Sequence, residues 1–287
     1  MAVSSLEKMS QPMSSIQASI IHALGVASTF DAAAEAERRI AFLADYLKAS
    51  GLRSYVLGIS GGVDSTTAGM LAQAAVKRLR DGGYEARFVA IRLPYGEQRD
   101  EADAERAVRT VDADRTVTVN IKPAADAMLE AVRRSSGELW NAAGADFHFG
   151  NIKAPQRMVA QYALAGSLGG IVIGTDHAAE ALMGFFTKFG DGAADILPLA
   201  GLNKRRIRAI ASQLGAPQEL VFKVPTADLE ENRPLRPDED AYGVTYDEID
   251  DFLEGKTIGK ESEARILKFY RSSAHKRAPP VTPEGEQ

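Results

Sequence analysis

Residues 55–65, YVLGISGGVDS, contain the pattern that decides the fold. Residues 55–59 form a short apolar run interrupted only by a glycine, which is typical of a parallel strand buried on both faces. Gly61 and Gly62 then allow a sharp turn and a close approach of the backbone to a ligand. Helical periodicity follows at about residues 64–80. The sequence therefore predicts a strand, a glycine turn and a helix in direct succession.

The side chains of this turn are suited to binding an anion. Ser60 and Ser65 supply hydroxyl donors, and the free amides at the start of the helix favour phosphate. Asp64 would repel phosphate unless a divalent cation lay between them, which suggests magnesium. The segment has neither the Gly-Lys-Ser/Thr ending of a P-loop nor the G-x-G-x-x-G dinucleotide pattern. The alternative is a purely structural turn in which Ser and Asp cap the helix.

The alternation of strand and helix continues along the chain. Short apolar runs predict further strands at residues 88–91, 116–119 and 171–173. Helical periodicity predicts helices at residues 31–50, 99–111, 124–134, 156–168, 204–214, 246–253 and 261–273. This order predicts an α/β single domain with a doubly wound parallel sheet and helices on both faces. Such sheets bind ligands beyond the carboxyl ends of their strands.

The composition excludes several classes of function. The 287 residues are 45% apolar and 25% charged, as in a globular protein. Lys plus Arg number 34 against 39 for Asp plus Glu, a net charge of -5, so we expect no nucleic-acid partner. The absence of cysteine excludes disulfides, thiolate metal sites and thiol nucleophiles. No apolar stretch reaches the ~20 residues of a membrane span and no signal peptide is recognisable, so we expect no membrane partner and a cytoplasmic location.

Three segments follow from local composition. We expect residues 1–30 to be poorly ordered or weakly docked, because residues 1–15 are small and polar. Residues 31–277 are predicted to form the catalytic domain, and residues 278–287 a proline-rich tail. Within the domain, the acidic and proline-rich residues 225–240 are expected to be a mobile surface segment that a ligand orders.

The turn at residues 60–65, Ser-Gly-Gly-x-Asp-Ser, resembles the pyrophosphate loop of the ATP pyrophosphatases. These enzymes cleave ATP between the α and β phosphates and transfer AMP to a substrate oxygen. Later segments resemble the NAD synthetase family more specifically, in order from about residue 35 to 280, and its ammonia-dependent, single-domain branch in particular. They are GTDHAAE at 174–180, FFTKFGDG at 185–192, LNKR at 202–205, PTADL at 225–229, GVTYD at 243–247, EID at 248–250 and HKR at 275–277.

The resemblance implies an adenine nucleotide alpha hydrolase-like fold and the last step of NAD biosynthesis. Deamido-NAD+ would be adenylated by ATP on its pyridine carboxylate, and free ammonia would then displace AMP. Glutamine-dependent relatives carry an added amidase domain with a cysteine nucleophile, and this chain shows neither the length nor the cysteine. The expected nitrogen donor is therefore ammonia. Relatives are homodimers with deamido-NAD+ bound across the interface, so a homodimer is implied.

The resemblance also assigns roles to individual residues. ATP would be bound by Gly58, Ile59, Ser60, Gly61, Gly62, Val63, Asp64, Ser65, Arg92, Gln98, Thr175, Lys204 and Thr226. Mg2+ would be held by Asp64 and Glu180. Deamido-NAD+ would be bound by Lys188, Asp195, His275 and Lys276. Asp191 and Asp195 are the catalytic candidates that hold or deprotonate ammonium, because the nucleophile must be neutral ammonia.

Without the resemblance, these residues have ordinary explanations. Glu180 would be a solvated helix residue, Lys204 a cation at the start of a helix, and residues 275–277 a basic helix end. His148 and His177 have no partner that the sequence reveals, and for His148 a structural role is the better interpretation.

One position departs from the family pattern. Relatives usually have Lys-Ala-Arg-x-Arg-Met where this chain has KAPQRM at residues 153–158. The arginine that contacts deamido-NAD+ in the family therefore falls on Pro155, which has no side-chain donor. Either Lys153 or Arg157 replaces it, or the contact is lost and the affinity for the substrate falls.

Two other functions compete with this interpretation. Another ATP pyrophosphatase, such as a tRNA-modifying or nucleotide-amidating ligase, would share the loop. The absence of cysteine disfavours sulfur transfer, and the negative charge disfavours tRNA. A non-enzymatic ATP-sensing domain would leave Lys188, Asp191 and Asp195 without an evident role.

Overall fold

The predicted strands form one parallel sheet. In the computed structural model, which describes residues 14–96, 101–141, 144–227 and 236–283, the sheet has the order β3-β2-β1-β4. The strands are β1 (Ser54–Gly58), β2 (Arg87–Arg92), β3 (Arg115–Thr118) and β4 (Gly170–Val172). β1 pairs in register with β2 on one side and β4 on the other, with Val56 opposite both Val89 and Val172. The parallel α/β fold is therefore confirmed.

Successive strand residues face opposite layers of helices. Tyr55 and Leu57 belong to a core cluster that includes residues of α2 (Ala32–Ser50), α3 (Val63–Asp81) and α8 (Lys204–Gln213). Val56 packs on the other face, in a cluster with residues of α6 (Ala145–Ser167). This alternation follows from the two-residue period of a strand. Both faces of the sheet are covered, as the continuous apolar runs predicted.

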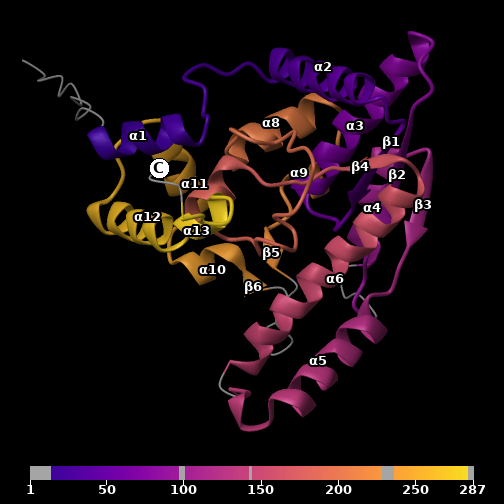
Figure 1. Cartoon of the computed structure of the whole chain (residues 1–287). Helices are drawn as coiled ribbons and strands as arrows, with labels where there is room; N and C mark the ends of the chain where they lie inside the picture. The colour runs from indigo at the N-terminus through magenta and orange to yellow at the C-terminus, as the bar shows by residue number, and fades with distance from the viewer. Residues whose placement is uncertain (1–13, 97–100, 142–143, 228–235, 284–287) are drawn as a thin grey trace, which may run out of the picture.

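A second group of helices lies beside the sheet (Figure 1). The helices α4 (Glu101–Val111), α5 (Lys122–Ser136), η1 (Gly137–Leu139) and α9 (Gln218–Val221) complete the sheet layers and their connections. The second group consists of α1 (Ser15–Ala23), α7 (Ala178–Met183), α10 (Asp238–Tyr242), α11 (Tyr246–Leu253), α12 (Lys260–Ser272) and α13 (Ala274–Arg277). Leu182, Phe252 and Ile266 are fully buried in its own apolar core. A short antiparallel pair, β5 (Thr226–Ala227) with β6 (Arg236–Pro237), lies next to α10.

The N-terminal segment differs from the prediction within residues 14–30. Ser14 caps α1, and Ile20 and Val26 are buried in the apolar core of the second helical group. The side chain of Gln17 is buried and donates hydrogen bonds to the carbonyls of Phe252 (2.8 Å) and Lys256 (3.0 Å). The expectation of poor order is therefore wrong for this part. Long-range packing that a single amphipathic turn does not reveal holds the segment in place.

α6 also differs from the prediction, because it begins well before Pro155 and contains this proline in its interior. A proline removes one main-chain N–H and normally ends or bends a helix. Here α6 continues because it packs against α5, β1 and β4 along its length. α5 and α6 pack side by side, and we refer to the two helices as the arm; α5 and the first half of α6 project from the rest of the molecule (Figure 1).

Several expectations fall outside the described residues. Gln98 and residues 228–235 of the predicted mobile segment lie outside the residues that the structure describes. Within the described ranges, no helix has both the length and the apolar composition that a membrane span requires.

Candidate active site

The glycine loop at the carboxyl end of β1 is built as a backbone cradle. Gly61 has φ of +93°, and a Cβ at this position would lie 2.9 Å from the amide nitrogen of Ala104. Only glycine fits both constraints. Gly62 is the N-cap of α3 and makes no side-chain cap hydrogen bond, while its own amide donates to Ser60 Oγ at 3.4 Å. The N-cap residue of α3 is therefore a glycine, and Ser60 and Ser65 accept hydrogen bonds from amides within the turn.

The hydroxyl groups of the loop bond to one another. Ser60 Oγ lies 3.1 Å from Ser65 Oγ, which also accepts from the amide of Ser60 at 3.2 Å. Gly58 donates from its amide to Gln161 of α6 at 2.8 Å, which links the loop to the helix on the other face of the sheet. The loop is therefore fixed at both ends, while the first amides of α3 remain open to an anion.

A cavity of about 470 Å³ opens beside this loop. Among the residues assigned from sequence, its walls include Gly58, Ile59, Ser60, Gly62, Val63, Asp64, Ser65, Thr175, Glu180, Asp191, Thr226 and Lys276. Within the described chain, the assigned residues that do not line it are Gly61, Arg92, Lys188, Asp195, Lys204 and His275. The cavity thus joins segments from both helical groups at the carboxyl edge of the sheet, where the fold predicts a ligand.

Asp64 and Lys204 form an ion pair at the base of the cavity. Lys204 Nζ lies 3.0 and 2.9 Å from the two carboxylate oxygens, and its side chain is 1% exposed. Burial alone would raise the pKa of Asp64, but Lys204 and His177 outweigh it and lower this pKa. Lys204 also lies 4.8 Å from the ring centre of Tyr246. The lysine therefore acts as the internal counter-ion of Asp64.

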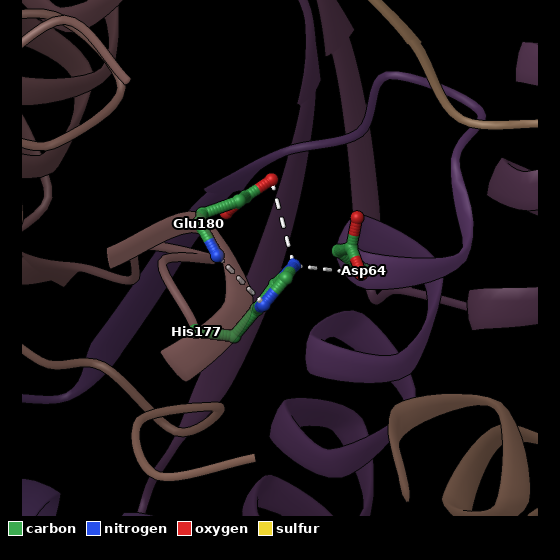
Figure 2. Close-up of side chains that lie close together, drawn as sticks. All are labelled: Asp64, His177 and Glu180. Atoms are coloured by element: carbon green, nitrogen blue, oxygen red, sulfur yellow. Dashed lines mark hydrogen bonds and ion pairs between the residues drawn. The ribbon is translucent and has the colours of Figure 1, made fainter. Parts of the chain in front are cut away.

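Glu180 lies near Asp64, and the ring of His177 lies between the two carboxylates (Figure 2). His177 Nε2 is 3.6 Å from an oxygen of Asp64 and 3.5 Å from an oxygen of Glu180. Asp64 and Glu180 line the cavity, whereas His177 does not. The sequence gave no partner for His177. Its only local signal is its position three residues before Glu180, at the start of a helix.

The donor set at this point fits a magnesium ion. One ligand atom from each of Asp64, His177 and Glu180 can be chosen so that all lie within 4.8 Å of one another. The two carboxylates face the cavity beside the phosphate-type loop. Mg2+ prefers one or two carboxylates together with phosphate and water oxygens, which matches Asp64 and Glu180.

Asp191 lies on the cavity wall, in the loop that follows α7, and is exposed there. Its Oδ1 accepts a hydrogen bond from the amide of Thr187 at 2.9 Å. Burial raises the pKa of Asp191 to about 6, and the charge of Glu180 adds to this effect. Asp176 is close enough to both acids that burial and their charges raise its pKa to about 8. Such a group of carboxylates favours a bound cation.

Asp195 has a structural environment. Its Oδ2 accepts from the amide of Val172 at 2.8 Å, and its Oδ1 accepts from the hydroxyl of Tyr162 at 3.3 Å. These bonds join the end of β4 to the loop that follows and to α6. Both oxygens therefore have a partner within the protein, and the roles that the resemblance implied for Asp195 stay a prediction.

Lys188 and Lys276 cross-link the C-terminal residues to the loop after α7. Lys188 Nζ donates to the carbonyls of His275 (2.8 Å) and Ala278 (2.6 Å). Lys276 Nζ donates in the other direction, to the carbonyls of Gly184 and Phe186, each at 2.8 Å. Of the three residues assigned to deamido-NAD+ here, Lys188, His275 and Lys276, only Lys276 lines the cavity, together with Gly184 and Phe186. The predicted substrate cations are thus gathered in one place, with main-chain carbonyls as their partners.

Arg92 is placed at the end of β2, as predicted, but it is buried. Its guanidinium pairs with both oxygens of Glu101 at 2.5 and 2.6 Å and lowers the pKa of that carboxyl. The pair joins β2 to the first turn of α4. The structure does not place Arg92 on the cavity wall.

The structure shows which of Lys153 and Arg157 is better placed to replace the arginine that the resemblance implies at position 155. Lys153 is 2% exposed, with Nζ 4.2 and 4.5 Å from the ring centres of Tyr95 and Phe149, and it does not line the cavity. Arg157 does line the cavity, and its Nε donates to the carbonyl of Leu93 at 3.1 Å. Arg157 is therefore the better-placed of the two.

Asp238 is a cavity residue that the sequence did not reveal. It is 6% exposed, lines the cavity, and accepts a hydrogen bond from the hydroxyl of Tyr246 at 2.9 Å. Burial raises its pKa to about 6. His148, in contrast, packs edge-on against the rings of Trp140 and Phe147, as its structural interpretation predicted.

Comparison with known proteins identifies the family. A model of the NAD synthase family matches residues 35–280. The chain is 66% identical over 266 residues to a relative from Burkholderia lata, described as NH(3)-dependent NAD(+) synthetase, covering 93% of this chain and 94% of that protein. The crystal structure of NAD+ synthetase from Burkholderia pseudomallei is 59% identical, with a TM-score of 0.81, and the match covers 95% of this chain and all of that one.

A second solved structure among the relatives is named for a different product. It is described as NMN synthetase from Francisella tularensis, is 34% identical with a TM-score of 0.77, and the match covers 90% of this chain and 100% of that chain. The family model and the high identity along most of the chain agree with the site at the carboxyl edge of the sheet. The chain belongs to the NAD synthase family.

Proposed function

We propose that this chain is an ammonia-dependent NAD+ synthetase, which converts deamido-NAD+, ATP and ammonia into NAD+, AMP and pyrophosphate. The observation that carries the proposal is the cavity, because it brings the glycine loop, the Asp64–Glu180 pair and Asp191 together. These groups correspond to the three needs of the reaction: binding phosphates, neutralising their charge and handling ammonium.

The first half-reaction activates the pyridine carboxylate. A carboxylate is a poor acyl donor because its leaving group would be oxide, whereas AMP leaves readily. A carboxylate oxygen of deamido-NAD+ attacks the α-phosphorus of ATP, and pyrophosphate departs with the electrons of the broken P–O bond. The open amides of α3 and the hydroxyls of Ser60 and Ser65 would hold the phosphates in line for this attack. Thr175 and Thr226 would complete the ATP site from two other walls.

Asp64 and Glu180 would hold Mg2+, which supplies positive charge for the ATP phosphates. Asp64 has Lys204 as its counter-ion. When a second cation shares Asp64, the ammonium of Lys204 is free to contact a phosphate oxygen instead. Lys204 would thus serve ATP although it does not line the cavity in this structure.

The second half-reaction needs neutral ammonia beside the activated carbonyl. Asp191 would hold ammonium and accept its proton, because its carboxylate lines the cavity and its pKa is raised to about 6 by burial. The nitrogen lone pair then attacks the acyl carbon, and AMP leaves with the electrons of the C–O bond. Lys276 would orient deamido-NAD+. His275 is its neighbour in the chain, and Lys188 donates to the carbonyl of His275.

The proposal includes a homodimer and a cytoplasmic location. Apolar side chains on the arm of α5 and α6 are exposed, with Val159 at 51% and Met128 at 46%. A surface of this kind is suited to packing against a second copy of the chain. ATP and deamido-NAD+ are highly charged and do not cross membranes unaided, which favours the compartment where they are made.

A coupled assay with purified protein tests the proposal. NAD+ and AMP should form with ATP, Mg2+, deamido-NAD+ and ammonium, and no NAD+ should form when glutamine replaces ammonium. Nicotinate mononucleotide should be tested as a parallel substrate, because the Francisella relative is described as an NMN synthetase. A higher kcat/KM with the mononucleotide would replace the proposed substrate. Pyrophosphate release that depends on RNA instead would place the chain with the tRNA-modifying ATP pyrophosphatases.

Asp64→Asn is the matched control for this assay. The variant keeps the shape of the side chain but loses the charge that holds Mg2+, so most activity should be lost. Near-wild-type turnover would contradict the metal assignment. Because Lys204 is left buried without its partner, the variant should also lose about 3–5 kcal/mol of stability, which calls for a folded-state check by circular dichroism.

A further inference from the structure

His177 is buried and held by its backbone. Its side chain has no exposed surface, and it lies at the end of the loop that leads from β4 into α7. The amide of Ala178 donates to the carbonyl of Leu202 at 2.8 Å, and the amide of Ala181 donates to the carbonyl of His177 at 2.9 Å. The imidazole therefore has little freedom to move away from the carboxylates it faces.

The N-terminus of α7 fixes the protonation of the ring. His177 is the N-cap of this helix, and its Nδ1 accepts a hydrogen bond from the amide of Glu180 at 3.4 Å. A nitrogen that accepts carries a lone pair and no proton, so the proton of the neutral ring is on Nε2. The opposite tautomer would point an N–H at the amide of Glu180 and remove the cap.

Nε2 is thus a donor directed between two acceptors. It lies 3.6 Å from Asp64 and 3.5 Å from Glu180, between the two carboxylates (Figure 2), and His177 does not line the cavity. Among the described residues, Nε2 makes no hydrogen bond in this structure. A nitrogen that carries a proton cannot at the same time donate a lone pair to a metal ion. The three side chains resemble a metal triad in position, but the histidine faces the carboxylates with a proton.

We propose that His177 is a positioning residue whose Nε2–H orients the carboxylates of Asp64 and Glu180, so that their remaining oxygens face the cation and the ATP phosphates. This rests on the proposed function only in taking these carboxylates as the magnesium ligands. Metal-bound carboxylates in proteins are commonly hydrogen-bonded by such outer partners, and loss of one typically weakens metal binding or activity by about 10–100-fold. A single N–H shared by two carboxylates also reduces the repulsion between them.

Two variants test the roles of the two ring nitrogens separately. His177→Asn places an oxygen near the Nδ1 position, so it keeps the helix cap and removes the donor. His177→Gln places its amide group near the Nε2 position, so it keeps a donor and removes the cap. With Mn2+ as a probe and an ATP analogue that cannot be cleaved between α and β, His177→Asn should bind the ion about 10–100-fold more weakly than wild type. His177→Gln should retain most of the affinity but melt at a lower temperature.

The opposite pattern would overturn the proposal. If His177→Asn binds Mn2+ like wild type while His177→Gln binds weakly, the histidine acts only as a helix cap. Two measurements on the wild-type chain need no variant. In the metal-free protein, long-range 1H–15N correlations should show His177 as the neutral tautomer protonated on Nε2. With Mn2+ and the ATP analogue bound, electron spin-echo spectra should show no directly coordinated 14N. Protonation on Nδ1, or a coordinated nitrogen, would make His177 a ligand and reject the positioning role.

These outcomes are independent of the substrate. If no NAD+ forms from deamido-NAD+ but the tautomer and the Mn2+ affinities are as expected, the proposed function fails while the positioning role stands. If NAD+ forms but a coordinated 14N is found, the positioning role fails while the proposed function stands.

Discussion

The charges of Asp64 and Lys204 are balanced within the protein before any ligand is bound. A buried lysine is tolerated only with a close partner, and both of its short contacts are to Asp64. A divalent cation bound to the same carboxylate brings a second positive charge and weakens the hold on Lys204. The negative phosphates of ATP restore the balance. Cation and nucleotide are therefore expected to bind together more strongly than either does alone.

The two candidate carboxylates for ammonium can be distinguished by their pH behaviour. Burial raises the pKa of Asp191 to about 6, so the carboxylate is ionised above this pH and protonated below it. A protonated carboxyl cannot accept a proton from ammonium. At constant free ammonia, NAD+ formation should therefore fall as the pH decreases through 6, while ATP–pyrophosphate exchange, which reports the adenylation alone, should change much less. An unchanged ratio of the two rates from pH 7 to 5 would contradict the assignment.

Isosteric variants sharpen this test. Asp191→Asn keeps an oxygen for the amide of Thr187, so it should fold normally and lose NAD+ formation by about 10²–10⁴-fold with exchange largely retained. Asp195→Asn should instead lower the melting temperature, because the amide of Val172 can lose its acceptor. Its ratio of NAD+ formation to exchange should stay near the wild-type value. A selective loss of NAD+ formation in Asp195→Asn would restore the role implied by the resemblance.

At the scale of elements, the sequence predicted those elements whose formation depends on residues close to one another in the chain. β1, β2 and β4 are built around short apolar runs, β3 is a Thr- and Val-containing edge strand, and each observed strand lies within one residue of its predicted bounds. The glycine loop could be predicted because the left-handed φ of Gly61 and the open cap at Gly62 are properties of the local chain. α1 could not, because its stability comes from Gln17 and Ile20 docking on helices far along the chain.

The residues of the candidate site divide in the same way, into those recognisable from local motifs and those whose roles depend on partners distant in sequence. The loop, Glu180, Asp191 and Lys276 were assigned from motifs, and all of them contribute to one cavity. His177 and Asp238 were missed as site residues because their roles depend on partners distant in sequence, Asp64 and Lys204 among them. The contacts of Asp195 could not be predicted for the same reason, since only the fold brings Val172 and Tyr162 to its oxygens.

Pro155 gives a prediction at the element scale. The proline lies inside α6, so the carbonyl one turn earlier loses its main-chain donor. Pro155→Ala should restore this bond and raise the free energy of unfolding by about 1–3 kcal/mol, measured by urea denaturation. Pro155→Arg should give a similar gain and, in addition, lower the KM for deamido-NAD+, because it supplies the guanidinium that the resemblance implies at this position. Equal KM values for the two variants would show that the arginine contact is already replaced, with Arg157 as the candidate.

At the scale of the molecule, the arm of α5 and α6 is the feature that a single chain does not explain. Val159, Ala163 and Gly166 are exposed at spacings of four and three residues and so lie along one side of α6. Met128 and Val132 expose apolar surface one turn apart on α5. A projecting arm of this composition would be costly to leave in water. Packing against the same arm of a second copy would remove this apolar surface from water. In a dimer with two-fold symmetry, the same patch on both copies forms the contact.

Introducing a charge into this surface tests the dimer. Val159→Glu should shift the protein from dimer to monomer in sedimentation velocity, because an unpaired carboxylate would be buried at the centre of the contact. Phe42→Glu is the matched control, because Phe42 is also apolar and 45% exposed but lies on α2, away from the arm (Figure 1). If deamido-NAD+ binds across the interface, monomeric Val159→Glu should have a raised KM for deamido-NAD+ and an almost unchanged affinity for ATP, whose proposed loop lies within one chain. A dimer that survives Val159→Glu but dissociates in Phe42→Glu would move the interface to α2.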